Sequence, residues 1–329
     1  MSFYIKDLEI KKSVILAPMA GITSFSYRKF LSEFGVGATY SEMISDCGLI
    51  YNNKKTIEMM KNDSNFNRPY GIQLFGGSKE SLLKGLEVIE NSNIEYDFLD
   101  LNLACPVPKV TKGNGGSKWL TKLDEMYEMV KAVVEKSKKP VTAKVRLGWK
   151  SVDIEKICVL LEKAGVSFIA IHARTKEELY SGKPHFEELK NIRDLIHIPF
   201  GVSGNIFSVN DALNALKITR ADAVLIARGG IGNPNLIKNI NLALANKEYD
   251  ENVTFEEQKQ YLYRFMEYLK EEKGEFTAVS LLKGLAPKFF NFNFPFIKEL
   301  RSNLSQKISS YSDIYNRIRE YEEKYLQTN

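Results

Sequence analysis

Chemistry-bearing side chains follow an apolar stretch near residue 100. The segment from Asp100 to Pro106 leaves a predicted strand, 98–101, and enters a polar loop that holds Asn102 and Cys105. Because Pro106 has no amide proton, it ends the regular structure, and a thiol just past a strand end is well placed to meet a ligand. Free cysteines are also often inert small hydrophobes, so the rest of the chain must decide between these readings.

The elements that would position this loop form a regular series. Strands are predicted at 14–18, 38–41, 70–74, 98–101, 141–146, 168–172, 200–202 and 223–227. Helical periods separate most of them, as at 79–89, 126–134, 154–164 and 209–216, and such helices return the chain so that each new strand lies parallel to the last. Eight units in about 240 residues predict a (β/α)8 TIM barrel, with an open doubly wound sheet as the competitor.

Polar or unusual residues recur at the carboxyl ends of these strands, where the working groups of such barrels gather. They are Pro18, Met19 and Ala20, then Gln73, Asn102 and Cys105, Lys144 and Arg146, His172 and Arg174, Ser203, Gly204 and Asn205, and Ala227, Arg228 and Gly229. Burying Lys144 or Gln73 is costly without a partner, and a polar cofactor ring would be one. The alternatives are a solvated lysine at Lys144 and a hydrogen-bonded core histidine at His172.

The turns after the seventh and eighth strands are rich in glycine. Gly204, Gly229, Gly230 and Gly232 let backbone amides approach an anion, and a helix is predicted to begin near Pro234. With Arg228 as the counter-charge, these turns predict a phosphate site, although tight turns need glycine in any case.

Together these motifs resemble the flavin-dependent tRNA-dihydrouridine synthase family of the bacterial type. The matching pieces are Ala17 to Thr23, Ser41 to Met43, Gln73 to Gly76, Asp100 to Val110, Gly116-Ser117, Lys144 to Trp149, His172 to Thr175 and Tyr180 to Gly182. They run in order from near the amino terminus to about Gly232, and weaker similarity continues beyond. Such a series of ordered matches is highly specific.

The resemblance implies an enzyme that reduces uridine in tRNA, with bound FMN and with NADPH as reductant. It implies that FMN is held by Pro18, Met19, Ala20, Gln73, Lys144, His172, Ser203, Gly204, Asn205, Ala227, Arg228 and Gly229. A hydride would pass from flavin N5 to C6 of uridine, while Cys105 protonates C5. Asn102, Arg146 and Arg174 would contact the substrate, and the thiol of a general acid must keep its proton until that step.

Three positions depart from the family pattern. Ala104 stands where glycine usually precedes the cysteine, Ser203-Gly204-Asn205 replaces the more usual Asn-Gly-Asp, and Asn235 stands where tryptophan is common. The second departure puts the detailed flavin hydrogen bonds in question.

The chain of 329 residues is too long for the barrel alone. We predict a catalytic barrel over 1–246 and a small all-helical RNA-binding domain over 255–329, joined by a polar linker. Lysines and an arginine of the segment 283–307, among them Lys283 and Arg301, adjoin the phenylalanines between 289 and 296. Such an arrangement suits RNA, and the net charge of +5 permits such a partner. The alternative is that these aromatic residues form the core of the helical domain.

Three cysteines without metal-type spacing predict neither a disulfide framework nor a metal site, and Cys47 and Cys158 are expected to be structural. No signal peptide or membrane span is recognised, so a soluble, cytoplasmic monomer is expected. Three competing functions stay open: a flavin dehydrogenase of free pyrimidines such as dihydroorotate, the same chemistry on ribosomal RNA, and an RNA-binding protein that keeps the barrel as a scaffold.

Overall fold

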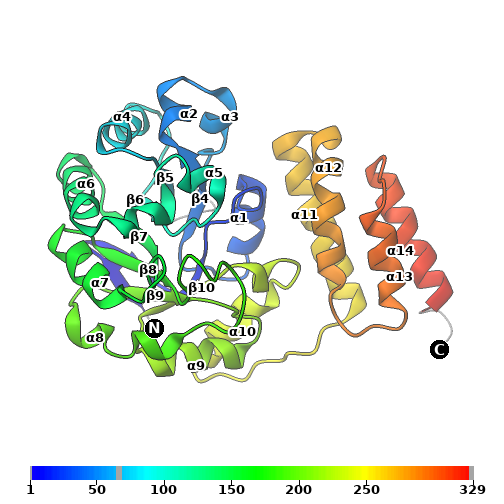
Figure 1. Cartoon of the computed structure of the whole chain (residues 1–329). Coiled ribbons are helices and arrows are strands. Elements are labelled where there is room, and N and C mark those ends of the chain that lie inside the picture. The colour runs from blue at the N-terminus through cyan, green and yellow to red at the C-terminus, as the bar shows by residue number, and fades with distance from the viewer. Residues whose placement is uncertain (1, 64–68, 326–329) are drawn as a thin grey trace.

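The computed structural model describes residues 2–63 and 69–325, and its core is a barrel of parallel strands wrapped by helices (Figure 1). The barrel strands are β3 (Val14–Leu16), β4 (Thr39–Ser45), β5 (Tyr70–Phe75), β6 (Phe98–Leu103), β7 (Val141–Arg146), β8 (Phe168–His172), β9 (Phe200–Ser203) and β10 (Ala223–Ile226). Each strand pairs with the next along the chain, from β4 to β10, and β10 pairs with β3.

Two main-chain hydrogen bonds close the ring between β3 and β4. The amide of Leu16 donates to the carbonyl of Ala38 at 3.0 Å, and the amide of Gly37 donates to the carbonyl of Val14 at 2.7 Å. A closed ring has no exposed edge, whereas a doubly wound sheet is open. The predicted TIM barrel is therefore confirmed.

Helices cover the outside of the barrel and form the region that follows it. The α-helices are α1 (Phe25–Ser32), α2 (Asp46–Ile50), α3 (Lys54–Glu58), α4 (Lys79–Glu90), α5 (Pro108–Thr111), α6 (Leu123–Lys136), α7 (Ile154–Lys163), α8 (Ile192–Leu195), α9 (Val209–Thr219), α10 (Asn235–Leu244), α11 (Phe255–Lys273), α12 (Glu275–Leu285), α13 (Ile297–Ser305) and α14 (Tyr311–Tyr325). Short 3₁₀ turns are η1 (Gly116–Thr121), η2 (Phe186–Leu189), η3 (Arg228–Gly230) and η4 (Ala286–Phe290). Helices α4, α6, α7 and α9 match their predicted ranges within a few residues.

A hairpin at the amino terminus closes the bottom of the barrel. Its strands, β1 (Phe3–Ile5) and β2 (Leu8–Ile10), pair antiparallel, and Phe3, Ile5 and Ile10 join the apolar cluster inside the barrel. The ring of Phe3 stacks on Phe168, with 5.5 Å between centroids. The sequence analysis missed this hairpin, although its alternating apolar residues signal it.

Two strands extend further than predicted. β4 continues to Ser45, with a register shift between Tyr40 and Met43, and β6 continues to Leu103. Asn102 therefore lies within β6, facing the same side as Phe98 and Asp100 by strand alternation. The expectation that Asn102 follows the strand was wrong, because the apolar Leu103 pairs with Val145 and prolongs the sheet.

The C-terminal helices α11 to α14 lie on one side of the barrel, and α11 packs on α1 (Figure 1). Phe265 of α11 packs on Phe30 of α1, with 5.7 Å between ring centroids, and the side chain of Glu272 accepts a hydrogen bond from the amide of Ser26 at 2.7 Å. The all-helical prediction is confirmed, whereas the division at 246 and 255 stays a prediction. In the described ranges, none of the helices has the length and apolar character needed to cross a membrane.

Candidate active site

A cavity of about 320 Å³ opens at the carboxyl ends of the barrel strands. Most of the predicted site residues line it: Pro18, Met19, Ala20, Gln73, Asn102, Cys105, Lys144, Arg146, His172, Ser203, Gly204, Asn205, Ala227, Arg228 and Gly229. Arg174, Lys283 and Arg301 are not among the lining residues. Residues from every barrel strand or its following loop thus meet in one place, as expected for a barrel whose parallel strands all end on the same face.

The main chain of the Cys105 loop is held from two sides. On one side, the side-chain oxygen of Asn102 accepts hydrogen bonds from the amides of Ala104, at 3.2 Å, and Cys105, at 2.9 Å. On the other, the carbonyl of Cys105 accepts from the amide and the hydroxyl of Ser117, both at 3.0 Å. A Cβ on Gly116 would lie 2.6 Å from that carbonyl, so this contact requires glycine. The loop is therefore fixed rather than free to swing.

The Cys105 thiol keeps its proton at neutral pH. The residue is 8% exposed, and burial raises the pKa of the thiol, against weaker opposing effects from a backbone hydrogen bond and from Arg146 and Lys144. Burial disfavours the thiolate because a charge loses its hydration there. The group thus suits proton donation better than nucleophilic attack.

Lys144 lies on the cavity wall, on β7, and pairs in register with Asn102 of β6. Burial lowers the pKa of Lys144 to about 8, with a further lowering by Arg146 that Asp100 and Cys105 oppose. The ammonium is therefore still mostly protonated at pH 7, and a ligand that carries an acceptor would satisfy it.

His172 is neutral. Burial and then the positive charges of Lys144, Arg146, Arg174 and Arg228 hold the pKa of His172 well below its usual value. The guanidinium of Arg174 lies 3.2 Å from Nε2 of His172, and because a guanidinium only donates, Nε2 must accept and the proton must lie on Nδ1. The cavity therefore meets an uncharged imidazole in a defined tautomer.

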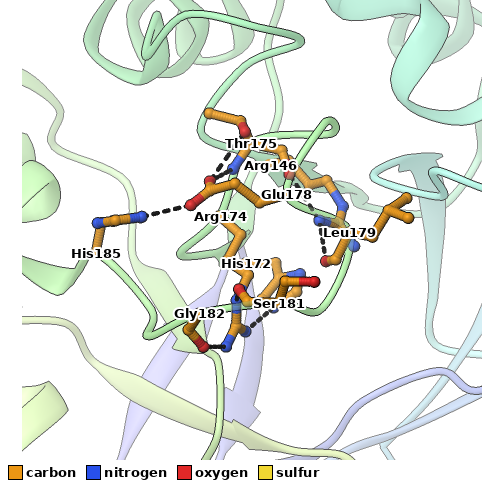
Figure 2. Close-up of polar contacts among 9 residues, drawn as sticks. All are labelled: Arg146, His172, Arg174, Thr175, Glu178, Leu179, Ser181, Gly182 and His185. Atoms are coloured by element: carbon orange, nitrogen blue, oxygen red, sulfur yellow. Dashed lines mark hydrogen bonds and ion pairs between the residues drawn. The ribbon is translucent and has the colours of Figure 1, made fainter.

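Arg146 and Arg174 hold the segment 175–182 against the barrel by hydrogen bonds (Figure 2). Arg146 donates to the carbonyls of Ala104, Thr175 and Leu179 at 2.8, 2.9 and 2.7 Å, and Arg174 donates to those of Ser181 and Gly182 at 2.8 and 2.7 Å.

Both arginines are almost fully buried, and Arg174 sits behind His172 rather than on the cavity wall. Their predicted contact with substrate stays a prediction. Their hydrogen-bond partners given above are main-chain carbonyls and, for Arg174, Nε2 of His172.

The glycine-rich turns after β9 and β10 approach each other closely. A Cβ on Gly229 would lie 2.0 Å from the carbonyl of Ile206, so only glycine fits there. The exposed Arg228 donates to Oδ1 of Asn205 at 3.1 Å, and its guanidinium lies 5.2 Å from the ring of Tyr180. A cationic side chain beside backbone of this kind suits an anionic group such as phosphate.

Comparison with known proteins identifies the family. The profile described as Dihydrouridine synthase (Dus) matches residues 15–312. The chain belongs to the dihydrouridine synthase family. It is 33% identical over 288 residues to a probable tRNA-dihydrouridine synthase of Aquifex aeolicus, covering 84% of this chain and 88% of that one. It is 30% identical over 279 residues to tRNA-dihydrouridine synthase B of Vibrio vulnificus, covering 83% and 85%.

Solved structures share the fold at low identity. An old yellow enzyme homologue from Zymomonas mobilis matches with a TM-score of 0.50 and 10% identity, covering 78% of this chain and 95% of that one. The 6-hydroxypseudooxynicotine amine oxidase of Pseudomonas geniculata matches with a TM-score of 0.56 and 13% identity, covering 74% of this chain and 49% of that one. These likenesses support the barrel, and membership of the dihydrouridine synthase family makes the chain an oxidoreductase.

Several lining residues of this dihydrouridine synthase family member were not predicted as site residues. They include Met43, Tyr180, Ile206 and Phe207. Met43 and Tyr180 lie inside motifs that carry the family resemblance, so those motifs were the available signal. Ile206 and Phe207 follow Asn205 directly, and their apolar character concealed their position at the cavity.

The predicted RNA-facing residues of the helical region divide in two. Lys283 is exposed, whereas Nε of Arg301 is buried without a hydrogen-bond partner. Phe289 and Phe290 are buried and pack on Phe265 and Phe255, so for these two rings the alternative reading, a helical core, is the right one.

The two remaining cysteines differ. Cys158 is buried as expected, but Cys47 is exposed at the start of α2, so its expected structural role was wrong. Across the described ranges, no group of three or more histidine, cysteine, aspartate or glutamate side chains could hold a metal ion.

The Asn235 departure has a structural counterpart. Its side-chain oxygen accepts a hydrogen bond from the hydroxyl of Tyr261 in α11 at 2.9 Å. Nearby, Gly232 leaves room for the backbone of Lys288, because a Cβ there would lie 2.3 Å from that carbonyl. At the position where tryptophan is expected from the family pattern, this chain links the segment after the glycine-rich β10 turn to the helical region through a polar contact.

Proposed function

We propose that the protein is an FMN-dependent tRNA-dihydrouridine synthase that reduces the C5–C6 double bond of uridine in tRNA, with NADPH as electron source. The observation that carries the proposal is the protonated Cys105 thiol, fixed on the wall of the barrel-mouth cavity within a chain of the dihydrouridine synthase family. The tRNA substrate is supported by the names of the bacterial relatives.

The residues at the cavity suit FMN. Ala17, Met19, Met43 and Leu225 offer apolar surface for a ring system, and Gln73 and Lys144 offer donors for its polar edge. The turns at 203–205 and 227–229, with Arg228, suit the phosphate. When bound, reduced FMN supplies the hydride that is added to C6 of uridine.

Cys105 then acts as the acid that delivers a proton to C5. A donor must hold its proton until carbanion character develops at C5, and burial keeps this thiol protonated. Asn102 holds the Cys105 amide and also lines the cavity, so one side chain can position both the acid and the pyrimidine. His172, uncharged, would contact the flavin without adding to its charge.

The helical region would hold the rest of the RNA while the target base enters the barrel. A base in folded RNA must be extruded to reach a cavity of this kind, and a second surface must bind the remainder. We propose residues 255–329 as that surface, with Lys283 among its phosphate contacts, on a cytoplasmic monomer.

The proposal is tested by visible absorption of the purified protein under anaerobic conditions. We expect a flavin spectrum that bleaches on addition of NADPH and returns on addition of unmodified tRNA. Return with ribosomal RNA alone, or with free uracil or orotate alone, would replace the proposed substrate. A protein that is colourless and cannot be loaded with FMN would contradict the proposal and favour an RNA-binding scaffold.

A further inference from the structure

A chain of buried hydrogen bonds runs beneath the Cys105 loop, from Asp100 through two amides. Nε2 of Gln73 donates to Oδ2 of Asp100 at 2.6 Å, and Nδ2 of Asn102 donates to Oε1 of Gln73 at 2.8 Å. Oδ1 of Asn102 then accepts from the amides of Ala104 and Cys105. Asp100 and Gln73 are fully buried and Asn102 is 5% exposed, so water offers these groups little alternative.

The direction of this relay is determined at both ends. A backbone amide can only donate, so the atom of Asn102 that faces Cys105 must be its oxygen, and its nitrogen must face Gln73. At the other end, an ionised carboxylate can only accept, so the nitrogen of Gln73 must face Asp100. The hydroxyl of Thr142 donates to the second carboxylate oxygen at 2.6 Å, which completes the partners of Asp100. Reversing either amide would place two donors or two acceptors against each other.

The relay also determines which hydrogen-bonding group of Asn102 is left for a ligand in the cavity. The oxygen of Asn102 already accepts two hydrogen bonds, and one of its two N–H groups is engaged by Gln73. What remains on Asn102 is one N–H donor, and this side chain lines the cavity. A ligand atom that meets Asn102 must therefore be an acceptor, such as the carbonyl oxygen of a pyrimidine.

We propose that Asp100 is a positioning residue for the reaction: by orienting Gln73 and, through it, Asn102, it holds the Cys105 loop and directs an N–H donor at the substrate. Asp100 is not among the residues that line the cavity, and it reaches the Cys105 loop through these two amides. This inference rests on the proposed function in so far as Cys105 is the acid, but the hydrogen-bond relay does not depend on the identity of the substrate.

The test measures how readily Cys105 reacts with iodoacetamide in the oxidised, FMN-loaded enzyme. A Cys47→Ser background removes the exposed thiol, and Cys158 is fully buried, so labelling reports on Cys105. Adding Cys105→Ala to this background should abolish labelling. The compared variants are Asp100→Leu, which removes the acceptor for Gln73, and Asp100→Asn, whose oxygen can still accept from Gln73 while its amide faces Thr142.

We expect Asp100→Leu to raise the alkylation rate about tenfold, because the loop loses an anchor worth a hydrogen bond to a charged group. Asp100→Asn should stay within about twofold of the parent, since the direction of the relay is kept. Thr142→Val is the matched control: it removes the other partner of Asp100 and leaves the relay intact, so its alkylation rate should match that of the parent. Flavin absorbance and melting temperature are recorded for every variant.

An unchanged rate in folded, flavin-loaded Asp100→Leu would overturn the proposal, as would an equal rise in Asp100→Asn or in Thr142→Val. If Asp100→Leu does not fold, Gln73→Leu cuts the relay one residue nearer to Cys105 and should produce the same rise; an unchanged rate there would equally overturn the proposal. The labelling needs neither NADPH nor tRNA. Failure of tRNA to reoxidise the flavin would therefore refute the proposed function while leaving this measurement interpretable.

Discussion

The two ends of the barrel interior are built from the same strands. Every second residue of a strand points inward, and along β6 and β8 these residues change from apolar at one end to polar at the other. On β6 the inward positions read Phe98, Asp100 and Asn102, and on β8 they read Phe168, Ala170 and His172. The lower ends are apolar and covered by the β1–β2 hairpin, while the upper ends are polar and open to the cavity. In this barrel, therefore, the residues at one end of the strands stabilise the fold, and those at the other end line the candidate site.

The cost of the polar end is met by hydrogen bonds. Buried amides and charges destabilise a fold unless they are paired, and the relay through Gln73 and the main-chain contacts of Arg146 pair them. The apolar end needs no such arrangement, because burial alone favours it. Substitutions at the two ends should therefore affect different observables.

The largest effect is expected at the polar end. Cys105→Ala should lower the rate of dihydrouridine formation by about 10² to 10⁴, the usual contribution of a general acid, while the melting temperature and bound flavin stay close to those of the parent. Single-turnover assays of the reduced enzyme with tRNA, alongside thermal melts, measure both. Full activity would show that another group protonates the substrate.

At the apolar end, Phe168→Ala should lower the free energy of unfolding by about 3 to 5 kcal/mol, because it opens a cavity beneath Phe3 and the hairpin. The folded fraction should keep its turnover with tRNA. Phe276→Ala is the control, because Phe276 is 93% exposed and its removal should change stability by less than about 0.5 kcal/mol. Denaturant titrations measure the free energy of unfolding of each variant. An equal decrease in both variants would contradict the expected difference between core and surface.

Asp100 lies between the apolar and the polar end of β6, and its titration should make the stability of the fold depend on pH. Burial raises the pKa of Asp100 from 3.8 to about 6, against hydrogen bonds from Gln73 and Thr142 and the charge of Lys144. The folded chain then binds this proton more tightly than the unfolded chain, so stability falls as pH rises between about 4 and 6, by about 3 kcal/mol in total. Asp100→Asn should lack this component. Unfolding free energies of both proteins from pH 4 to 7 measure the difference, and parallel curves would contradict it.

The smallest effect is expected outside the barrel. Lys283→Ala should weaken tRNA binding uniformly and reduce the slope of log K against log salt by about 1, with no change in stability. Lys11→Ala is the matched control, since Lys11 is exposed beside the hairpin at the closed end. An unchanged salt slope for Lys283→Ala would remove this lysine from the RNA surface.

The polar end could be predicted from the sequence because parallel strands bring their carboxyl ends together. Gln73, Lys144 and His172 stand at such ends, so once eight strands are recognised their meeting follows without knowledge of side-chain geometry. The roles expected of these residues came from the family motifs. Met43 and Tyr180 also lie within those motifs, although neither was predicted as a site residue.

Other features could not be read in this way, because they depend on partners distant in the chain. The charge of Arg146 predicts a ligand contact, yet its guanidinium is engaged by carbonyls of residues 104, 175 and 179 that no local pattern reveals. Phe289 and Phe290 lie in a short 3₁₀ turn, where no helical period marks them as core residues. Their nearness to lysines in the sequence therefore suggested an RNA-binding surface, whereas both rings are buried in the hydrophobic core. The amide relay likewise joins β5 and β6 across the sheet.

The most direct test of the account is the product itself. NADPH-reduced wild-type enzyme and reduced Cys105→Ala are each mixed once with unmodified tRNA, and the digested nucleosides are analysed by mass spectrometry. The account predicts dihydrouridine, with the mass of two added hydrogens, from the wild-type enzyme and almost none from the variant at the same reaction time. Equal yields from both proteins, or no dihydrouridine from flavin-loaded wild-type enzyme, would contradict it.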